Sequence, residues 1–382
     1  MKIELPSDQL NSAKLSFTCR RVDLLDARCL IREPYQPEVG DIVLATVEQL
    51  GQHKRIELDN GRRATIEPGD LVILAYGNRY APDQFEGVVP YSLSSCSMIA
   101  AGGIAATEIT RHRKMVEATK IRPVGVLADE QGKALNLSDY RLPDTSCDTP
   151  RLPLFVSCGT SMNSGKTHTA CSLIRGLTAM GYSVGAIKIT GTGAGGDLWR
   201  MWDSGAKHVL DFTDAGMPST YLASQEALLE VAELLLDRIA TDSDVNVVVA
   251  EIADGVSHPE TGLLLQSSLI KSRASGVLFA AGDALGAYSG YRWLRDQQLP
   301  ILGICGTLAL SPLAMRELSA LVPVNPLTSE ELTSPTRLQT ILPESFVKAS
   351  AIMQLPAHAQ ISSPVGDTDH GNEGNQADAF RA

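Results

Sequence analysis

The residues best suited to chemistry form the run GTSMNSGKT at 159–167. An apolar run at 152–156 precedes it and a helix-length segment at 167–180 follows it, so the pattern predicts a strand, a glycine-containing loop and a helix. In such a loop, backbone N–H groups and the helix N-terminus bind phosphate, the lysine reaches the β- and γ-phosphates, and the hydroxyl ligates Mg²⁺. Lys166 and Thr167 fill the last two roles. The nucleotide-binding residues that we predict are Gly159, Thr160, Ser161, Met162, Asn163, Ser164, Gly165, Lys166, Thr167 and His168.

Charged residues follow two further apolar runs. Lys188 lies at the end of the run at 183–189 and precedes a glycine-rich stretch, which favours a second half of an anion site; a flexible loop is the competing interpretation. Glu251 and Asp254 end the run at 245–252, and we prefer Glu251 as the acid that holds Mg²⁺ directly or through water. Further carboxylates, of which we expect one or two at most to be functional, are Asp197, Asp203, Asp211 and Asp214.

The elements that must position these residues alternate beyond residue 150. Strands are predicted at 152–156, 183–189, 245–252, 276–281, 300–305 and 321–324. Helices are predicted at 167–180, 198–207, 225–240, 263–273, 287–298 and 311–320. This alternation is typical of the α/β class, with a doubly wound, mostly parallel sheet. Ligands of such sheets bind at the carboxyl ends of the strands, where the residues singled out above lie.

The first part of the chain has a different pattern. Short strand-like runs between turn signals at 35–90, including the Asp59-Asn60-Gly61 turn, predict a small antiparallel barrel. We therefore predict a β-rich domain at 1–150, a nucleotide-binding domain at 151–345 and a disordered tail at 355–382. The polar and aromatic stretch at 78–87 could contact a substrate or partner, but an ordinary surface connection is favoured.

Composition excludes several classes of protein. The 382 residues are 44% hydrophobic and 20% charged, as in ordinary globular chains, and the formal net charge of −11 disfavours a large non-specific nucleic-acid surface. Seven cysteines without a CxxC pair do not form a disulfide framework, and the histidines lack zinc-site spacing. With neither a signal-peptide pattern nor a membrane span in the sequence, we expect a cytoplasmic protein without a membrane partner.

The loop departs from the strict phosphate-loop pattern, because Thr160 stands where the first glycine is expected and Gly159 comes one residue earlier. This spacing resembles the dethiobiotin synthetase group of P-loop proteins. Lys188 is similar to the strand-end lysine of that group and of the molybdopterin-guanine dinucleotide accessory proteins, and Glu251 resembles its acid after the third strand. The stretch from Thr190 to Asp214 also resembles the C-terminal domain of the DUF1611 family of P-loop proteins. The resemblance covers about 150–330.

This resemblance implies a P-loop NTPase with an ATP and Mg²⁺ site, in a fold that often forms homodimers. It implies that Glu251 and either Asp197 or Asp203 assist the metal, and that Lys188 faces an anionic substrate or a phosphorylated intermediate. The residues after Lys188 and Glu251 differ from those of the synthetases, so a biotin-precursor ligase is not expected.

Two functions remain open. The first is a ligase-like or kinase-like enzyme, or a hydrolase, that uses ATP to activate or phosphorylate a small molecule. The second is a nucleotide-dependent switch whose N-terminal barrel binds a protein or nucleic-acid partner. The strand-end residues favour the first function, and the additional domain favours the second.

Overall fold

The computed structural model describes residues 2–5, 7–145, 149–242 and 244–353. Internal contacts divide the chain into two compact units, Met1–Pro343 and Glu344–Ala382. The second unit contains helix α11 (Glu344–Met353). The tail predicted at 355–382 lies outside the described residues. All other elements belong to the first unit.

The N-terminal part of the first unit is rich in strands, as predicted. A ten-stranded sheet contains β1 (Lys2–Glu4), β2 (Lys14–Leu15), β3 (Cys29–Ile31), β4 (Ile42–Gln49), β7 (Leu71–Tyr76), β8 (Arg79–Tyr80), β9 (Phe85–Val88), β10 (Cys96–Ala100), β11 (Ile104–Arg111) and β12 (Thr119–Ala128). Strand β10 pairs with both β11 and β12, so the pairing runs through β12, β4, β7, β11 and β10 and returns to β12. The short helix of this part is α1 (Ser7–Ser12).

Strand β4 explains why this sheet has two buried faces. Alternate side chains of a strand point to opposite faces. Val43, Ala45 and Val47 pack into one hydrophobic cluster, and Ile42 and Leu44 pack into another. Both sets are almost completely buried.

The turn predicted at 59–61 is confirmed. It joins the antiparallel strands β5 (Arg55–Glu57) and β6 (Arg63–Thr65). Gly61 has a φ of 81°, which side chains rarely adopt, so a glycine suits this turn.

A six-stranded parallel sheet follows, as the alternating sequence predicts. Its strands are β13 (Leu154–Gly159), β14 (Val184–Lys188), β15 (His208–Asp211), β16 (Val247–Glu251), β17 (Ala274–Ala280) and β18 (Ile301–Cys305). Their order is β15-β14-β16-β13-β17-β18. The chain leaves the central strand β13 toward one side of the sheet and later returns to its other side at β17. A crevice for ligands forms where the direction of winding changes in this way.

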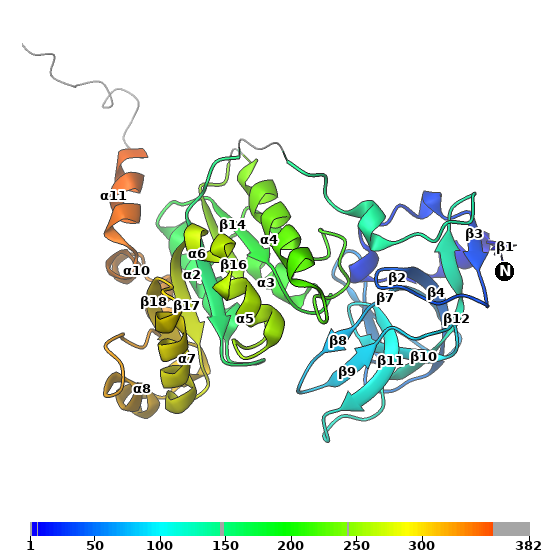
Figure 1. The fold of residues 1–382 in the computed structure, drawn as a ribbon, viewed down its shortest axis with the longest axis horizontal. Helices are drawn as coiled ribbons and strands as arrows, with labels where there is room; N and C mark the ends of the chain where they lie inside the picture. Colours follow the sequence, from blue (N-terminus) through cyan, green and yellow to red (C-terminus); the bar gives the residue numbers. More distant parts are fainter. Residues whose placement is uncertain (1, 6, 146–148, 243, 354–382) are drawn as a thin grey trace, which may run out of the picture. The chain divides into compact units, whose positions relative to one another are not determined.

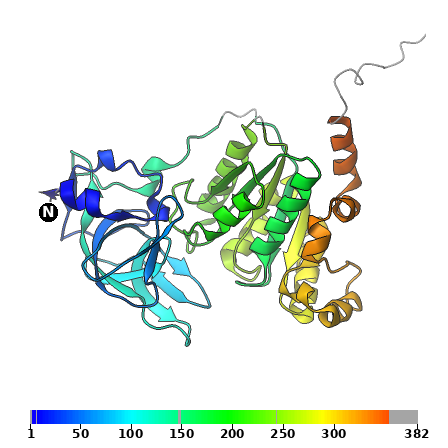
Figure 2. The same ribbon diagram turned by 180° about the vertical axis from the view of Figure 1, so that it is seen from behind.

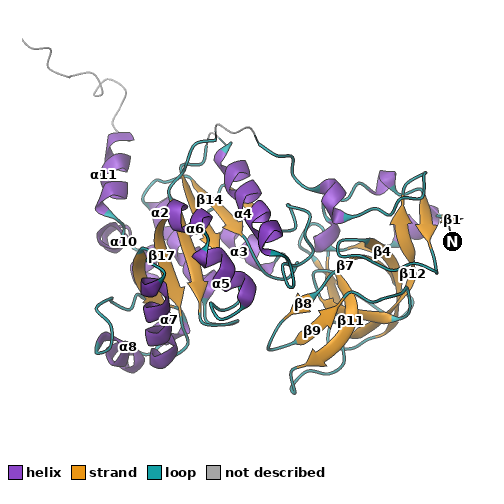
Figure 3. Ribbon diagram, viewed as in Figure 1, coloured by secondary structure: helices purple, strands orange, loops and turns teal. Residues whose placement is uncertain are grey.

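Helices cover this sheet (Figure 3). The helices of this part of the chain are α2 (Lys166–Ala179), α3 (Gly196–Asp203), α4 (Gln225–Ala240), α5 (Pro259–Gln266), α6 (Ser268–Arg273), α7 (Ala284–Asp296), α8 (Pro312–Ser319), α9 (Ser329–Thr333) and α10 (Pro335–Ile341). Figure 1 shows α4, α5 and α7 in front of the strands, and Figure 2 shows the green helices α2 and α3 from the opposite side. The contacts agree, because α2 packs on α3, α9 and α10, whereas α4 packs on α5.

Three sequence predictions differ from the structure. Strand β15 was not expected, because its four residues give too short an apolar run. The predicted strand at 321–324 does not form; it contains Pro323, which cannot donate to a ladder, and only Pro326 makes an isolated bridge with Ile304. The helix predicted at 263–273 is two helices, because the Ser267 hydroxyl accepts from the Ile270 N–H and starts α6.

Candidate functional site

The 160–165 loop connects the central strand β13 to helix α2, as predicted. Its backbone is fixed at both ends: the Thr160 N–H donates to the Ala280 carbonyl at 3.0 Å, and the Thr307 N–H donates to the Ser164 carbonyl at 3.0 Å. Asn163 and Gly165 have φ values of 63° and 104°. The loop is therefore held in a turned conformation against the ends of β17 and β18.

Helix α2 begins at Lys166, so its first N–H groups lie beside the loop. The first N–H groups of a helix have no partner within the helix, and together with the helix dipole they favour a bound anion. The Lys166 side chain is buried, and its Nζ donates to the Ser161 carbonyl at 2.7 Å. Burial lowers the pKa of Lys166, although Glu251 and Asp254 act in the opposite direction. The lysine thus lies over the loop that we predict to bind phosphate.

Thr167 brings two of the predicted metal residues together. Its Oγ1 lies 3.0 Å from Asp197 Oδ1 and 3.0 Å from Glu251 Oε1. A hydroxyl carries a single proton, so it can donate to only one of these carboxylates at a time. Three oxygen atoms from a loop–helix junction, a helix and a strand end therefore lie close together.

Lys188 joins this cluster from the end of β14. Its Nζ forms an ion pair with Asp197, and in the sheet it is paired directly with Glu251 on β16. Burial alone would lower the pKa of Lys188, but Asp197 and Glu251 raise it above its usual value. Lys188 therefore stays charged within the cluster.

Glu251 is the least satisfied member of the cluster. Its side chain is buried, and its Oε2 has no hydrogen-bond partner among the described residues. Burial, and then repulsion by Asp197, raise the pKa of Glu251 to about 7, while Lys188 and Lys166 lower it. An unpartnered carboxylate oxygen beside a hydroxyl and a second carboxylate suits a hard divalent cation. In the described part of the chain, no group of three or more His, Cys, Asp or Glu side chains could hold a metal alone.

The other candidate acids lie elsewhere. Asp203 is exposed at the end of α3 and lines a different cavity with Cys171 and Arg175. Asp211 and Asp214 are buried, and both pair with Arg20, which lies 3.2 Å and 2.7 Å from their carboxylate oxygens. The pairing with Arg20 explains why these two acids are buried, without a role at the metal.

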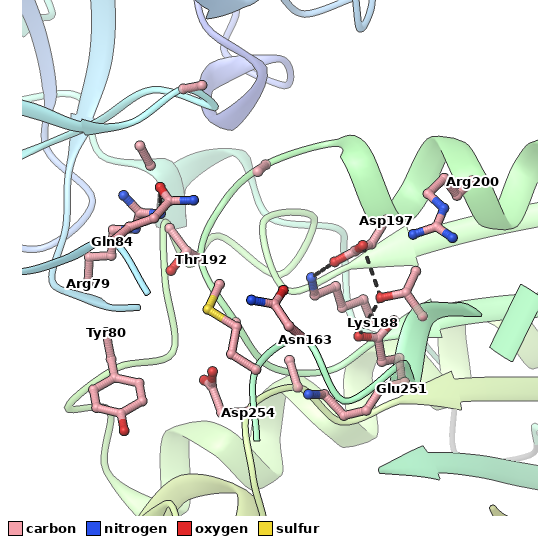
Figure 4. Close-up of a pocket in the computed structure, with 18 of the residues that line it drawn as sticks. Arg79, Tyr80, Gln84, Asn163, Lys188, Thr192, Asp197, Arg200, Glu251 and Asp254 are labelled. Carbon is pink, nitrogen blue, oxygen red and sulfur yellow. Dashed lines mark hydrogen bonds and ion pairs between the residues drawn. The ribbon is translucent and has the colours of Figure 1, made fainter. Parts of the chain in front are cut away.

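The predicted loop, Lys188, Asp197 and Glu251 line a cavity of about 620 Å³ within the first unit (Figure 4). Residues of the β-rich part supply its other wall. They are His53, Glu57, Arg63, Arg79, Tyr80, Gln84, Ala100 and Ala101. Asp254 also lines the cavity, whereas Asp203 does not.

Hydrogen bonds join the two walls of the cavity. The Asn163 side chain of the loop donates to Asp83 at 2.8 Å. The Glu57 carboxylate accepts from the Gly195 N–H at 3.0 Å and from the Trp199 indole at 3.1 Å. These bonds fix the β-rich wall against the loop and against the start of α3.

The β-rich wall contains cavity residues that the sequence does not mark as functional. The stretch at 78–87 was interpreted as a surface connection, yet it supplies Arg79, Tyr80 and Gln84 to the cavity and Asp83 to the loop. Its polar and aromatic composition was the available signal. His53 and Glu57 had no local signal in the sequence, because they enter the cavity through long-range packing.

Two solved structures resemble part of the chain. One is a nucleotide-binding protein from Archaeoglobus fulgidus in complex with ADP; it is 12% identical, with a TM-score of 0.31, and the match covers 50% of this chain and 90% of that chain. The other is the signal recognition particle 54 kDa protein from Aeropyrum pernix K1 in complex with GDP; it is 21% identical, with a TM-score of 0.32, and the match covers 57% of this chain and 53% of that chain. Similarity at this level carries no inference about function.

No protein-family model matches the chain, and no curated protein matches its sequence. Within the described residues, no helix has the length and apolar character needed to cross a bilayer.

Proposed function

We propose that this protein binds ATP with Mg²⁺ and uses ATP to activate or phosphorylate a small anionic substrate. The observation that carries the proposal is the cluster at the start of α2, where Thr167 lies 3.0 Å from carboxylate oxygens of both Asp197 and Glu251. Lys166 and Lys188 line the same cavity. A phosphate loop, oxygen ligands and two cations in one cavity are the parts that phosphoryl transfer needs.

The residues have distinct roles in this proposal. The loop N–H groups and Lys166 hold the β- and γ-phosphates, and the bond from Lys166 to the Ser161 carbonyl is exchanged for a bond to phosphate. Lys188 neutralises charge that develops on the transferred group and on the substrate. Such catalysis depends mainly on positioning and on electrostatic stabilisation.

The residues present fit a magnesium ion, because Thr167, Glu251 and Asp197 offer only oxygen atoms, and Mg²⁺ prefers oxygen ligands. Between the two acids left open by the sequence, proximity to Thr167 favours Asp197 over Asp203. Bound Mg²⁺ would supply charge neutralisation at the phosphates. Burial and the neighbouring Asp197 raise the pKa of Glu251, so a cation beside the two carboxylates would offset their repulsion.

A nucleotide-dependent switch is the second candidate, and one contact favours it. Asn163 of the loop bonds to Asp83 of the β-rich part at 2.8 Å, so a change at the phosphates has a direct connection to residues 1–150. If the protein is such a switch, residues 1–150 form a barrel-like domain that binds a protein or nucleic-acid partner. Phosphate release stimulated by a small molecule supports the enzyme, and stimulation by a macromolecule supports the switch.

The first experiment is a thermal-shift titration of the wild type and Lys166→Ala with ATP, ADP and GTP, each with and without Mg²⁺. A ligand at a concentration of ~100 Kd stabilises the native state by roughly 2.7 kcal/mol. We expect a Mg²⁺-dependent shift with ATP in the wild type and its loss in Lys166→Ala. Exposed Lys114→Ala is the matched control and should respond as the wild type does. Absence of any nucleotide response in the wild type would refute the proposed function.

A further inference from the structure

Arg79, on the β-rich wall of the cavity, is a buried cation with unused hydrogen-bond donors. It lies on β8, is 5% exposed, and lines the cavity beside Gln84 and Thr192 (Figure 4). Its Nη2 donates to Gln84 Oε1 at 2.8 Å. Its Nε and Nη1 are buried and have no partner among the described residues. Leaving a buried charged donor unpaired is costly, so these two N–H groups require an explanation.

The charges around Arg79 leave its guanidinium poorly compensated. Burial lowers the pKa of Arg79 to about 10, and Asp83 opposes this shift only partly. Asp83 is the hydrogen-bond acceptor of the Asn163 side chain instead. Glu57, the carboxylate of the same wall, accepts from Gly195 and Trp199.

Three other cations with little exposed surface in the described part of the chain are paired with carboxylates. Arg20 bonds to Asp211 and Asp214, and Arg273 lies 2.9 Å from Asp237. Lys188, in the same cavity, pairs with Asp197. Lys166, which is buried in the same cavity, bonds to the Ser161 carbonyl instead. Arg79 lines a cavity large enough for a small molecule, and its unpartnered Nε and Nη1 are buried beside that cavity.

We propose that Arg79 and Gln84 bind an oxyanion of the second substrate, either a carboxylate or a phosphate. This inference rests on the proposed function. It deepens that function by assigning the substrate two anionic groups, one that reacts beside Lys188 and one that Arg79 holds at the β-rich wall.

The chemistry of the two side chains fits this role. A guanidinium presents parallel N–H donors that match the two oxygens of a carboxylate or a phosphate. The Gln84 bond fixes the orientation of the guanidinium, and the Gln84 amide carries a further N–H₂ donor. A buried arginine also selects against neutral molecules, which would leave its charge unpaired.

The test uses the full-length chain without nucleotide. Every protein in it carries Lys166→Ala, which weakens anion binding at the phosphate loop and so separates that loop from the proposed anion site; Lys166→Ala alone is called the background protein. Thermal unfolding is followed with acetate, succinate and inorganic phosphate as probes. The compared proteins are Lys166→Ala alone, the same protein with Arg79→Gln, and the same protein with Arg113→Gln. Arg113 is an exposed arginine of the β-rich part that does not line the cavity, so it is the matched control.

We expect succinate or phosphate to raise the melting temperature of the background protein and of the Arg113→Gln control. Arg79→Gln should weaken that apparent affinity by at least about tenfold, since bonds to a charged group contribute about 1.5–3 kcal/mol. A response to both carboxylates identifies a carboxylate site, and a response to phosphate alone identifies a phosphate site. Without a probe, Arg79→Gln should melt no lower than the background protein, because it removes an unpaired buried charge.

Equal probe responses with and without Arg79→Gln, including no response to any probe, would overturn the inference. A lower melting temperature of Arg79→Gln without a probe, together with unchanged probe binding, would make Arg79 a structural residue. The proposed function fails separately, if the wild type shows no Lys166-dependent nucleotide shift while the Arg79-dependent anion response persists.

Discussion

The lowered pKa of His53 makes the environment of the β-rich wall measurable through stability. Its imidazole lines the cavity, and its Nε2 donates to the Ile99 carbonyl at 3.0 Å. Burial, and then the charge of Arg79, lower the pKa of His53 from 6.5 to about 4, and the Ile99 bond acts in the opposite direction. His53→Gln keeps a donor for the carbonyl but removes the titration.

The lowered pKa of His53 makes the free energy of unfolding depend on pH. Between pH 6.5 and pH 4 the unfolded chain binds a proton at His53 and the folded protein does not, so acid stabilises the unfolded state and stability falls as pH falls. The shift is 6.5 − 4 = 2.5 units, and at ~1.36 kcal/mol per unit the total effect is limited to roughly 3 kcal/mol. About 2 kcal/mol of this is lost between pH 7 and pH 5.

The assay is urea unfolding of the wild type and His53→Gln from pH 7 to pH 4.5. Because the two proteins share all other titrating groups, the difference in their unfolding free energies isolates His53. That difference should change by about 2 kcal/mol in favour of the variant as pH falls to 5. A constant difference between wild type and His53→Gln would refute the low pKa of His53.

Two further substitutions test how the cavity is built. Arg20→Ala removes the ion pair of Asp211 and leaves Asp214 with Arg21 alone, at 3.6 Å, so it should destabilise the protein by about 3 kcal/mol in urea unfolding; a loss below about 1 kcal/mol would contradict this assignment. Gly255→Ala places a Cβ 2.0 Å from the Thr160 carbonyl oxygen, so the phosphate loop must move, and we expect ATP affinity in calorimetry to fall at least about tenfold. Gly282→Ala, whose Cβ would have a nearest contact of 3.6 Å, should bind as the wild type does.

Much of the loop side of the site could be predicted from the sequence, because its signals are local. The run that ends in Lys166 and Thr167 specifies a strand, a turn and a helix within a few residues. Lys188 and Glu251 were identified because the carboxyl ends of neighbouring parallel strands meet at one edge. The pairing of Lys188 with Glu251 across β14 and β16 agrees with that reasoning.

The other residues of the candidate site could not be identified from the sequence, because their roles depend on distances in the folded chain. Asp197 and Asp203 are chemically identical carboxylates on one helix, and a rise of ~1.5 Å per residue separates them by roughly 9 Å. Asp197, in the first turn of α3, is the acid that contacts Thr167. Strand pairing and packing of the β-rich part place Arg79 at the cavity. The polar stretch at 78–87 does not indicate in the sequence which part of the chain Arg79 will lie against.

The residues that line the cavity are made in a fixed order during synthesis, because they extend from His53 to Asp254 along the chain. The β-rich wall leaves the ribosome first, with the Arg79 charge already in place, whereas Glu251 is added only after three strands of the parallel sheet have been made. A nascent chain that ends before β16 therefore has half of the cavity without the acid that completes it. The lining of the cavity is complete at Asp254, before β17 and β18 have been made. The bonds that hold the 160–165 loop against Ala280 and Thr307 therefore form only after all the lining residues are present.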